Sequence, residues 1–363
     1  MPKVKIKKLS EKELEYYSRQ IVLADIGYKG QLKLRNARVC VVGIGGLGSQ
    51  AALLLAGMGI GHLRLVDQDI IELSNLQRQP LYGVDFIGYP KVEVAAKRLH
   101  EHNPNIEVEP LPLSLNSENA GDIVHGMDVV VDGLDHMAPR YALNRACQAY
   151  NVPYIFGAAI TTYGSVSTII PGKTACLECF QGNLEDQMLP TCAVVGVQPS
   201  IINIIASIEV SEVERIILGQ TPNLMNKLFY CDVGSLTFQA IDISKTEDCP
   251  VCGSRLLRPP KPLQVELVTE ICGRKRKRVF VITPRKNLTL KMNDLLSLLE
   301  KSKFKIKVKT DLGITFDKGS DVKASILKSG VMIVEGLENE EKAWDLYSGI
   351  VIEGLKVSLS NIK

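Results

Sequence analysis

The stretch Arg38–Asp69, RVCVVGIGGLGSQAALLLAGMGIGHLRLVDQD, decides the fold of this chain. Its apolar run at 39–42 predicts a buried parallel strand, and the glycines that follow have GxGxxG spacing before an Ala/Leu-rich helical pattern. Such a turn presents backbone N–H groups at the positive end of a helix to an anionic ligand. A second predicted strand at 62–66 ends in an acidic residue that can accept hydrogen bonds from a ribose. The stretch therefore predicts a nucleotide site, for NAD as readily as for ATP, at Gly43, Gly45, Gly46, Gly48, Asp67 and Asp69.

The residues that follow favour ATP. Asn75, Arg78 and Lys91 come within the next two dozen positions, and a triphosphate needs fixed donors and point charges where a dinucleotide needs few. Lys91 falls in the first turn of a predicted helix, where a cation is unfavourable unless it faces an anion. Asp132 and Asp135 follow another predicted strand, so one carboxylate at that strand end can hold magnesium against the phosphates.

Predicted strands alternate with helices along the first 260 residues, as in a doubly wound sheet. A capping-box pattern at Ser10 and Glu13 predicts one helix to about Leu23. A long apolar helix is predicted at 201–218, with Glu209, Glu212 and Glu214 toward its exposed side. The further expected strands lie at 106–108, 128–131, 152–159 and 164–170, and another helix at 90–100.

Taken together, GxGGLG, D-x-D, SNLQRQ, the G-x-x-K of Gly88 to Lys91 and the D-x-x-D of Asp132 to Asp135 resemble the MoeB/ThiF family. These are adenylating enzymes related to the ubiquitin-activating (E1) enzymes, and the resemblance covers about residues 10–255. It implies a Rossmann-like adenylation domain that uses ATP and Mg²⁺, with the metal at Asp135. Its substrate would be the C-terminal carboxylate of a small ubiquitin-like protein ending in Gly-Gly.

The resemblance also implies roles for residues outside the glycine turn. In homodimers of the family, the arginine that matches Arg19 reaches across to the partner's ATP, so a homodimer is expected here. Cys192 precedes the predicted helix at 201–218, where its pKa can be lowered, and its position is similar to that of the cysteine that forms thioesters in some relatives. Other relatives stop at the adenylate, so a MoaD/ThiS-like sulfur-carrier adenylyltransferase stays open, as do an NAD-dependent oxidoreductase and a silent scaffold. Arg78, Lys91 and Asp135 argue against the last two.

Two CxxC pairs predict a zinc site. Cys176 and Cys179 form one pair, and Cys249 and Cys252 form the other. Each pair can chelate one edge of a tetrahedral ion, and four thiolates close the site to substrate, so the expected Zn²⁺ is structural. A thioredoxin-like redox pair is the alternative, but neither CxxC stands in such a context.

Composition excludes several classes. The chain has 363 residues, 45% hydrophobic and 23% charged, with a net charge of +3 and nine cysteines. No apolar run approaches the roughly 18 residues of a membrane span, and the basic N-terminus lacks the apolar core of a signal peptide. We therefore expect a cytoplasmic protein without membrane contact. A single basic run, GRKRKR, does not amount to a nucleic-acid site.

The chain divides at three prolines near position 260, which predicts an adenylation domain at 1–258 and a small domain at 259–363. From 260 onward there are 20 Lys/Arg and 13 Asp/Glu, a net of +7 against −4 for the rest. The pattern predicts an α+β domain with a strand at 278–283, a helix at 292–301, two strands at 304–316 and 322–335, a helix at 338–347 and a last strand near Leu355. Its position resembles that of the ubiquitin-fold domain of the ubiquitin-activating enzymes. We expect a separable unit that hands the activated carrier to an acidic partner such as a ubiquitin-conjugating enzyme and takes no part in activation. Docking of the carrier itself on this domain is the alternative.

Overall fold

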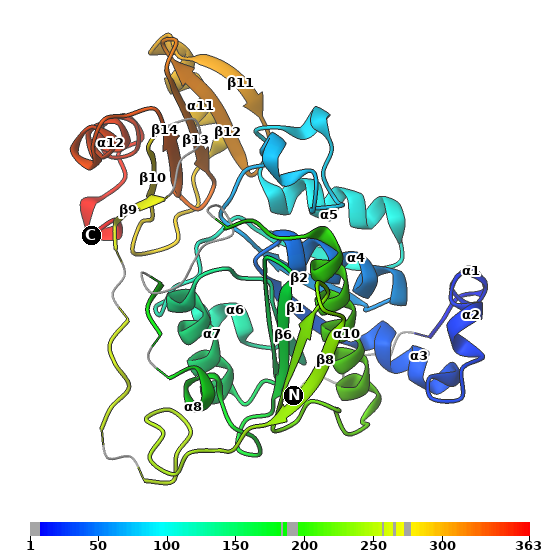
Figure 1. Cartoon of the computed structure of the whole chain (residues 1–363). Helices are drawn as coiled ribbons and strands as arrows, with labels where there is room; N and C mark the ends of the chain where they lie inside the picture. Colours follow the sequence, from blue (N-terminus) through cyan, green and yellow to red (C-terminus); the bar gives the residue numbers. More distant parts are fainter. Residues whose placement is uncertain (1–7, 183, 187–194, 256–257, 264–265, 272–276) are drawn as a thin grey trace.

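The structure is a computed structural model that describes residues 8–182, 184–186, 195–255, 258–263, 266–271 and 277–363. Two sheets organise it. The larger has a hydrophobic core on each of its faces and the smaller has a core of its own, and Figure 1 shows the smaller C-terminal sheet above the larger one. Among the described residues, no helix is long and apolar enough to cross a membrane.

The larger sheet has eight strands in the order β3-β2-β1-β4-β5-β6-β7-β8. The first five are parallel, and β6, β7 and β8 continue antiparallel. The doubly wound part was predicted, and the β7–β8 hairpin was not. The strands are β1 (Arg38–Val42), β2 (His62–Val66), β3 (Glu107–Leu111), β4 (Val129–Asp132), β5 (Tyr154–Ile160), β6 (Tyr163–Ile169), β7 (Lys227–Asp232) and β8 (Thr237–Asp242).

Helices cover both faces of this sheet because its central strands are apolar on both sides. Val39 and Val41 face the core formed with α3, α4, α5 and α10, whereas Cys40 and Val42 face the core formed with α6, α7 and α8. The helices are α3 (Gly27–Asn36), α4 (Gly46–Met58), α5 (Lys91–His102), α6 (Ala120–Val124), α7 (Met137–Tyr150), α8 (Leu177–Gln181) and α10 (Pro199–Leu218). Short 3₁₀ turns lie at Leu73–Asn75 and Val84–Phe86.

Two expectations for the helices need correction. The capping box of Ser10 and Glu13 is present, but the helix is broken at Tyr17 into α1 (Glu11–Tyr16) and α2 (Ser18–Ile21), because the buried Tyr17 side chain packs against the turn at Gly59. Glu209 and Glu212 on α10 are buried instead of exposed. Glu212 accepts hydrogen bonds from the backbone N–H groups of 223 and 224 and so ties α10 to the chain that follows it.

The C-terminal domain is a six-stranded antiparallel sheet in the order β11-β12-β13-β14-β10-β9 with two helices packed on it. The predicted strand at 304–316 divides at the turn containing Asp311, and that at 322–335 divides at Gly330. The strand expected near Leu355 was wrong, since a π-helix, Ser348–Gly354, precedes that residue. The elements are β9 (Val268–Ile271), β10 (Val279–Ile282), α11 (Met292–Lys301), β11 (Lys305–Lys309), β12 (Gly313–Lys318), β13 (Val322–Leu327), β14 (Met332–Glu335), α12 (Glu340–Tyr347) and a 3₁₀ turn at Leu359–Asn361.

The two sheets are not simply joined by a linker. Ile70, just beyond β2, forms a buried apolar cluster with Val281, Leu327 and Val331 of the C-terminal domain. In Figure 1, β11 and β12 lie against the loop that leads into α5. The C-terminal domain is therefore docked on the segment that follows β2 of the larger sheet.

Candidate adenylation site

The glycine turn after β1 has the predicted form. The backbone at Gly43 has a φ of 82°, in the left-handed region that glycine tolerates. A Cβ on Gly48 would lie 1.8 Å from the carbonyl oxygen of Gly43, so α4 can begin this close to the turn only with glycine there. At Gly45, the nearest described atom to an added Cβ is a side-chain nitrogen of Gln79 at 3.8 Å, so this side of the turn has room for a ligand.

Asp67 holds the turn from the neighbouring strand. Its carboxylate accepts hydrogen bonds from the backbone N–H groups of Ile44 and Asp69, each at 2.7 Å. Burial raises the pKa of Asp67 to about 6, although Lys91 acts to lower it. The Tyr82 hydroxyl donates to the Ile44 carbonyl at 2.8 Å and fixes the same residue from behind. Asp67 therefore shapes the nucleotide loop, a role added to the predicted ribose contact, and Tyr82 was not predicted at all.

Lys91 and Asp69 are brought together by backbone pairing between the segments 69–71 and 88–91. Ile70 pairs with Pro90 in an antiparallel bridge, and the Lys91 N–H donates to the Asp69 carbonyl at 2.9 Å. The Lys91 ammonium then lies 2.8 Å from the Asp69 carboxylate, with side-chain exposures of 6% and 43%. Burial opposes the charge on Lys91, but Asp69 and Asp67 raise its pKa above the usual range. Lys91 therefore keeps its positive charge beside the carboxyl end of β2.

The two carboxylates after β4 have different surroundings. Asp132 is buried, accepts from the Tyr154 hydroxyl at 2.5 Å and pairs with Arg140 at 3.2 Å. Asp135 has a side chain that is 76% exposed and bonds to His136 Nδ1 at 2.8 Å. Desolvation opposes its ionisation, but the hydrogen bond from His136, with the charges of His136 and Lys91, lowers its pKa to about 2. Asp135 is therefore the ionised, accessible carboxylate of the two, whereas Asp132 is already engaged.

His136 was given no role from the sequence, yet it is the partner of Asp135. Its bond to Asp135 raises the pKa of His136 to about 9, against the effect of desolvation. Arg140 was also missed as a site residue. It donates to the carbonyl groups of Leu134 and Gly157 at 2.6 and 2.7 Å, so it fixes the loop that carries Asp135. For the pair of Asp135 and His136, the only signal in the sequence was that the two residues are adjacent.

Asn75 and Arg78 lie in the loop between β2 and α5. The Asn75 side chain is buried and accepts from the Glu72 N–H at 2.9 Å, which closes the 3₁₀ turn at Leu73–Asn75. Arg78 is half-buried and donates to the Ser74 carbonyl at 2.9 Å. Both residues therefore have a local structural role, and their contact with a nucleotide stays a prediction.

Arg19 and Cys192 are the two predicted catalytic residues that the structure does not bring to the glycine turn. Arg19 is exposed on α2, which packs against α1 and α3 at the right-hand edge of the molecule in Figure 1. The same segment exposes Val22 and Leu23. Cys192 lies outside the described residues. The structure therefore tests neither the trans role of Arg19 nor the nucleophilic role of Cys192.

Four thiols form the one metal-like cluster among the described residues. The sulfur atoms of Cys176, Cys179, Cys249 and Cys252 all lie within 4.8 Å of one another. Three of the pairs are 3.9, 3.7 and 3.3 Å apart. A tetrahedral zinc with bonds of about 2.3 Å requires about 3.8 Å between sulfurs, so the cluster fits this ion. Such a centre would tie α8 to the segment after β8.

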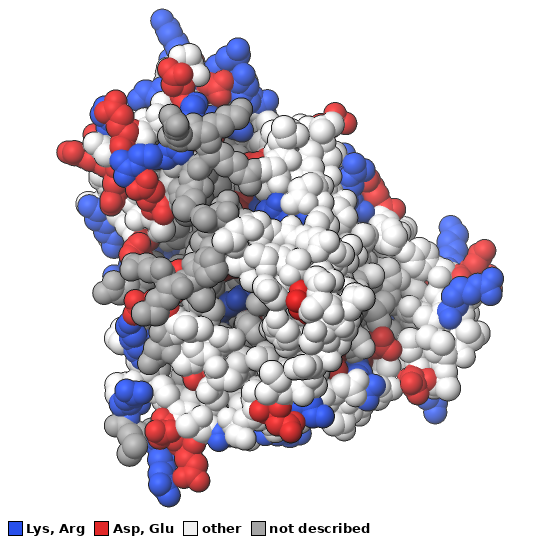
Figure 2. Space-filling view, in the orientation of Figure 1, with Lys and Arg blue, Asp and Glu red and all other residues white. Residues whose placement is uncertain are grey.

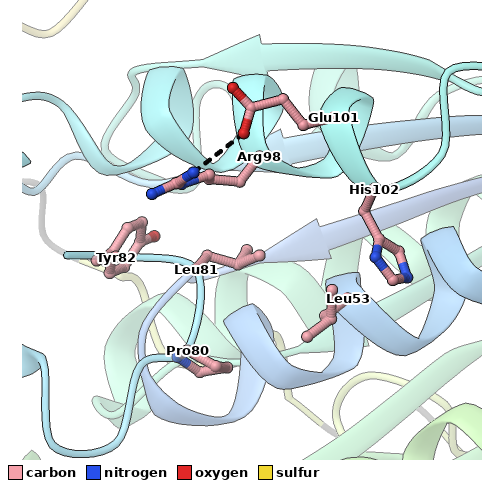
Figure 3. Close-up of a pocket in the computed structure, with 7 residues that line it drawn as sticks. All are labelled: Leu53, Pro80, Leu81, Tyr82, Arg98, Glu101 and His102. Atoms are coloured by element: carbon pink, nitrogen blue, oxygen red, sulfur yellow. Dashed lines mark hydrogen bonds and ion pairs between the residues drawn. The ribbon is translucent and has the colours of Figure 1, made fainter.

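A separate hollow of about 370 Å³ lies between α4, α5 and the loop at 80–82, as Figure 3 shows. Arg98 and Glu101 form an ion pair at its rim, and Leu53 and His102 line its far side. Its lining includes none of the residues predicted to bind the nucleotide. It touches the nucleotide loop only through Tyr82, whose hydroxyl reaches Ile44.

Comparisons with known proteins agree with this geometry. The chain is 37% identical over 246 residues to the SAMP-activating enzyme E1 of Haloferax volcanii, covering 68% of this chain and 91% of that protein. It is 36% identical over 248 residues to the sulfur carrier protein ThiS adenylyltransferase of Escherichia coli, covering 68% and 97%. The match to the adenylyltransferase and sulfurtransferase MOCS3 of Culex quinquefasciatus, 38% identical, covers 68% of this chain but only 57% of that enzyme. The solved structure of E. coli MccB superposes with a TM-score of 0.59 at 26% identity, covering 70% of this chain and 76% of MccB. Residues 17–251 match the ThiF family, and the chain therefore belongs to it.

Proposed function

We propose that this protein activates a small ubiquitin-like protein ending in Gly-Gly by ATP-dependent adenylation of its C-terminal carboxylate. The observation that carries the proposal is the position of Lys91, a buried cation beside the glycine turn that also lies close enough to Asp135 to lower the pKa of that carboxyl. A fixed cation and an ionised carboxylate on opposite sides of one loop suit a triphosphate with its magnesium. A nicotinamide dinucleotide needs neither.

The reaction follows from these charges. An oxygen of the carrier's carboxylate attacks the α-phosphorus of ATP, the bond to the bridging oxygen breaks, and pyrophosphate leaves with the electron pair. The carboxylate is already ionised at neutral pH, so no general base is required. Lys91 exchanges its Asp69 partner for phosphate oxygens, and Arg78 adds a second cation. Magnesium at Asp135 would neutralise further phosphate charge.

We propose that the enzyme is a homodimer in which Arg19 of the partner subunit completes the site. The support is the exposure of Arg19 on α2 next to Val22 and Leu23, apolar side chains that a second subunit would cover. The carrier would approach over the face around α10 and β8, which Figure 2 shows to be nearly free of charged side chains. Phe238 and Ile241 of β8 are exposed at the edge of the sheet, on its two opposite faces.

A thioester is proposed as the second step. The Cys192 thiolate attacks the carbonyl carbon of the adenylate, AMP leaves, and a ubiquitin-conjugating enzyme then accepts the acyl group. The alternative is a sulfur-carrier adenylyltransferase that stops at the adenylate, and one relative named above is a sulfur carrier protein adenylyltransferase. The zinc at the four cysteines is assigned a structural role only. A ubiquitin-like fold for the C-terminal domain and a cytoplasmic location stay predictions.

The test is ATP–pyrophosphate exchange with purified ubiquitin-like proteins that end in Gly-Gly. Exchange should depend on the carrier and should vanish with a matched carrier that lacks its last two glycines. Failure of exchange with every carrier, together with tight NAD binding, would overturn the proposal. Cys192→Ala distinguishes an enzyme that forms a thioester from one that stops at the adenylate. If the thioester forms, the variant should keep pyrophosphate exchange and lose a thiol-sensitive adduct with the carrier. An adduct that persists would place the nucleophile elsewhere.

A further inference from the structure

The C-terminal domain contacts the segment that carries Lys91. The Thr315 hydroxyl on β12 donates to the Gly88 carbonyl at 2.6 Å, and it shares a second hydrogen bond of 2.7 Å with Ser325 on β13. Thr315 is only 1% exposed. A buried hydroxyl with two partners is a fixed connection, since neither partner can turn to water instead.

Gly88 packs closely against the C-terminal domain. Its backbone has a φ of 92°, and an added Cβ would lie 3.2 Å from Val308 and 3.6 Å from Thr315. The Gly88 N–H donates to the Ile71 carbonyl at 2.8 Å, so the residue is held by the segment that follows β2 on one side and by the C-terminal domain on the other. Three residues later the chain reaches Lys91.

A second connection enters α5 directly. Glu93 accepts hydrogen bonds from the backbone N–H groups of Asp311 and Leu312, at 3.3 and 3.1 Å, in the turn between β11 and β12. Glu93 lies in the first turn of α5, two residues after Lys91. On the opposite strand of the bridge, Ile70 is covered by Leu327 and Val331. The domain therefore contacts both segments of the pair that holds Lys91 against Asp69.

We propose that the docked C-terminal domain positions Lys91 for phosphate binding, with Thr315 and Glu93 as positioning residues. Lysine has a long, flexible stem, so the place of its ammonium depends on how firmly its backbone is held. The domain holds that backbone at Gly88 and at Glu93. The ThiF match ends at residue 251, so this support comes from outside the shared family core. The inference rests on the proposed role of Lys91, and it gives the domain a part in activation that its separate composition had not suggested.

The test compares Thr315→Val with wild type in the full chain. Valine keeps the shape and removes the donor, Thr315→Ser restores it, and Thr269→Val changes an exposed threonine on β9 of the same domain as a matched control. Hydrogen exchange of the amides at 88–93 should be about tenfold faster in Thr315→Val, and the Kd for Mg·ATP should rise about tenfold, the equivalent of one lost hydrogen bond. Thr315→Ser and Thr269→Val should match wild type in both measurements.

Unchanged exchange at 88–93 and an unchanged Kd in Thr315→Val would overturn the inference and leave the domain a recruitment unit. If Thr315→Val does not fold, Glu93→Ala decides, because it removes both acceptors from a half-buried side chain on α5. Where pyrophosphate exchange is active, Thr315→Val should raise KM for ATP and leave kcat at saturating ATP unchanged. Hydrogen exchange and ATP binding need no carrier, so failure of the proposed adenylation is distinguishable from failure of this inference.

Discussion

Removal of the proposed zinc is the perturbation with the clearest expected size. Cys176 and Cys179 lie 73 residues before Cys249 and Cys252, and both Cys176 and Cys249 belong to the core under α7. Loss of one ligand would leave three thiolates crowded in that core without the ion that neutralises them. The segment after β8 would then lose its connection to α8.

The magnitude follows from linkage. An ion present at 1,000 times its Kd stabilises the folded state by about 4.1 kcal/mol. For a domain of 150–250 residues, 1 kcal/mol corresponds to roughly 2–4 °C, so the melting temperature should fall by roughly 8–16 °C in Cys249→Ser. Zinc-finger peptides lose about 10–16 kcal/mol, but they have no other core, so the smaller figure applies to this chain.

The assay pairs metal analysis with thermal unfolding. Wild type should carry one zinc per chain, and Cys249→Ser should carry none and melt early. Cys147→Ala, which changes a buried thiol outside the cluster, should keep its zinc. A wild-type protein without zinc, or with Cys176 and Cys179 oxidised to a disulfide, would refute the structural-zinc interpretation and favour a redox pair.

Three further outcomes test the nucleotide site. Lys91→Met should weaken ATP binding by about 10- to 100-fold, which corresponds to the loss of a hydrogen bond to a charged group and is measured by calorimetry. It should lower the free energy of unfolding by only about 1–2 kcal/mol, because its partner Asp69 is 43% exposed, and urea unfolding checks this value. The pKa of Asp67 is raised from 3.8 to about 6 in the folded state, so protonation of Asp67 favours folding at low pH. This contribution of about 3 kcal/mol to the free energy of unfolding is lost as pH rises from 4 to 6. Asp67→Asn should therefore flatten the plot of stability against pH in this range, and an unchanged slope would contradict the assignment. Arg19→Ala and Asp135→Ala proteins, each inactive in pyrophosphate exchange, should recover activity when mixed, since one hybrid site then has both groups; mixed dimers without recovery would place Arg19 outside the partner's site.

The parts of the fold that sequence predicted are those with a strong local signal. β1 and β4 are apolar on both faces and give hydrophobic runs at 39–42 and 129–131, and the turn after β1 needs its glycines for steric reasons that act within a few residues. The hairpin of β7 and β8 was missed because β8, its outer strand, lies at the sheet edge. Phe238 and Ile241 are exposed there, so the alternation that marks a half-buried strand is absent.

The site shows the same division. Lys91 and Asp135 were recognised because each follows a strand or begins a helix, and ends of parallel strands meet at one edge. The interactions that these two residues make were not recognised, although Asp69 was itself among the predicted site residues. The bond from His136 to Asp135 and the pairing of Lys91 with Asp69 depend on loop paths, and the second pairing exists only because segments 69–71 and 88–91 form a bridge. No spacing in the sequence specifies that bridge.

The docking of the C-terminal domain was also hidden from sequence, for a related reason. Prolines near 260 and a change of net charge report the local stiffness and solubility of the chain, and neither determines the distance between two domains. The contacts that reach the Lys91 segment include an apolar side chain, Ile70, a hydroxyl, Thr315, and a carboxylate, Glu93, each of which looks unremarkable in its own segment. These residues meet only after two sheets have formed. They meet at the backbone that carries Lys91, so the difference in composition between the two domains does not separate activation from hand-over. The first measurement on a variant of the basic C-terminal domain should therefore be its affinity for ATP.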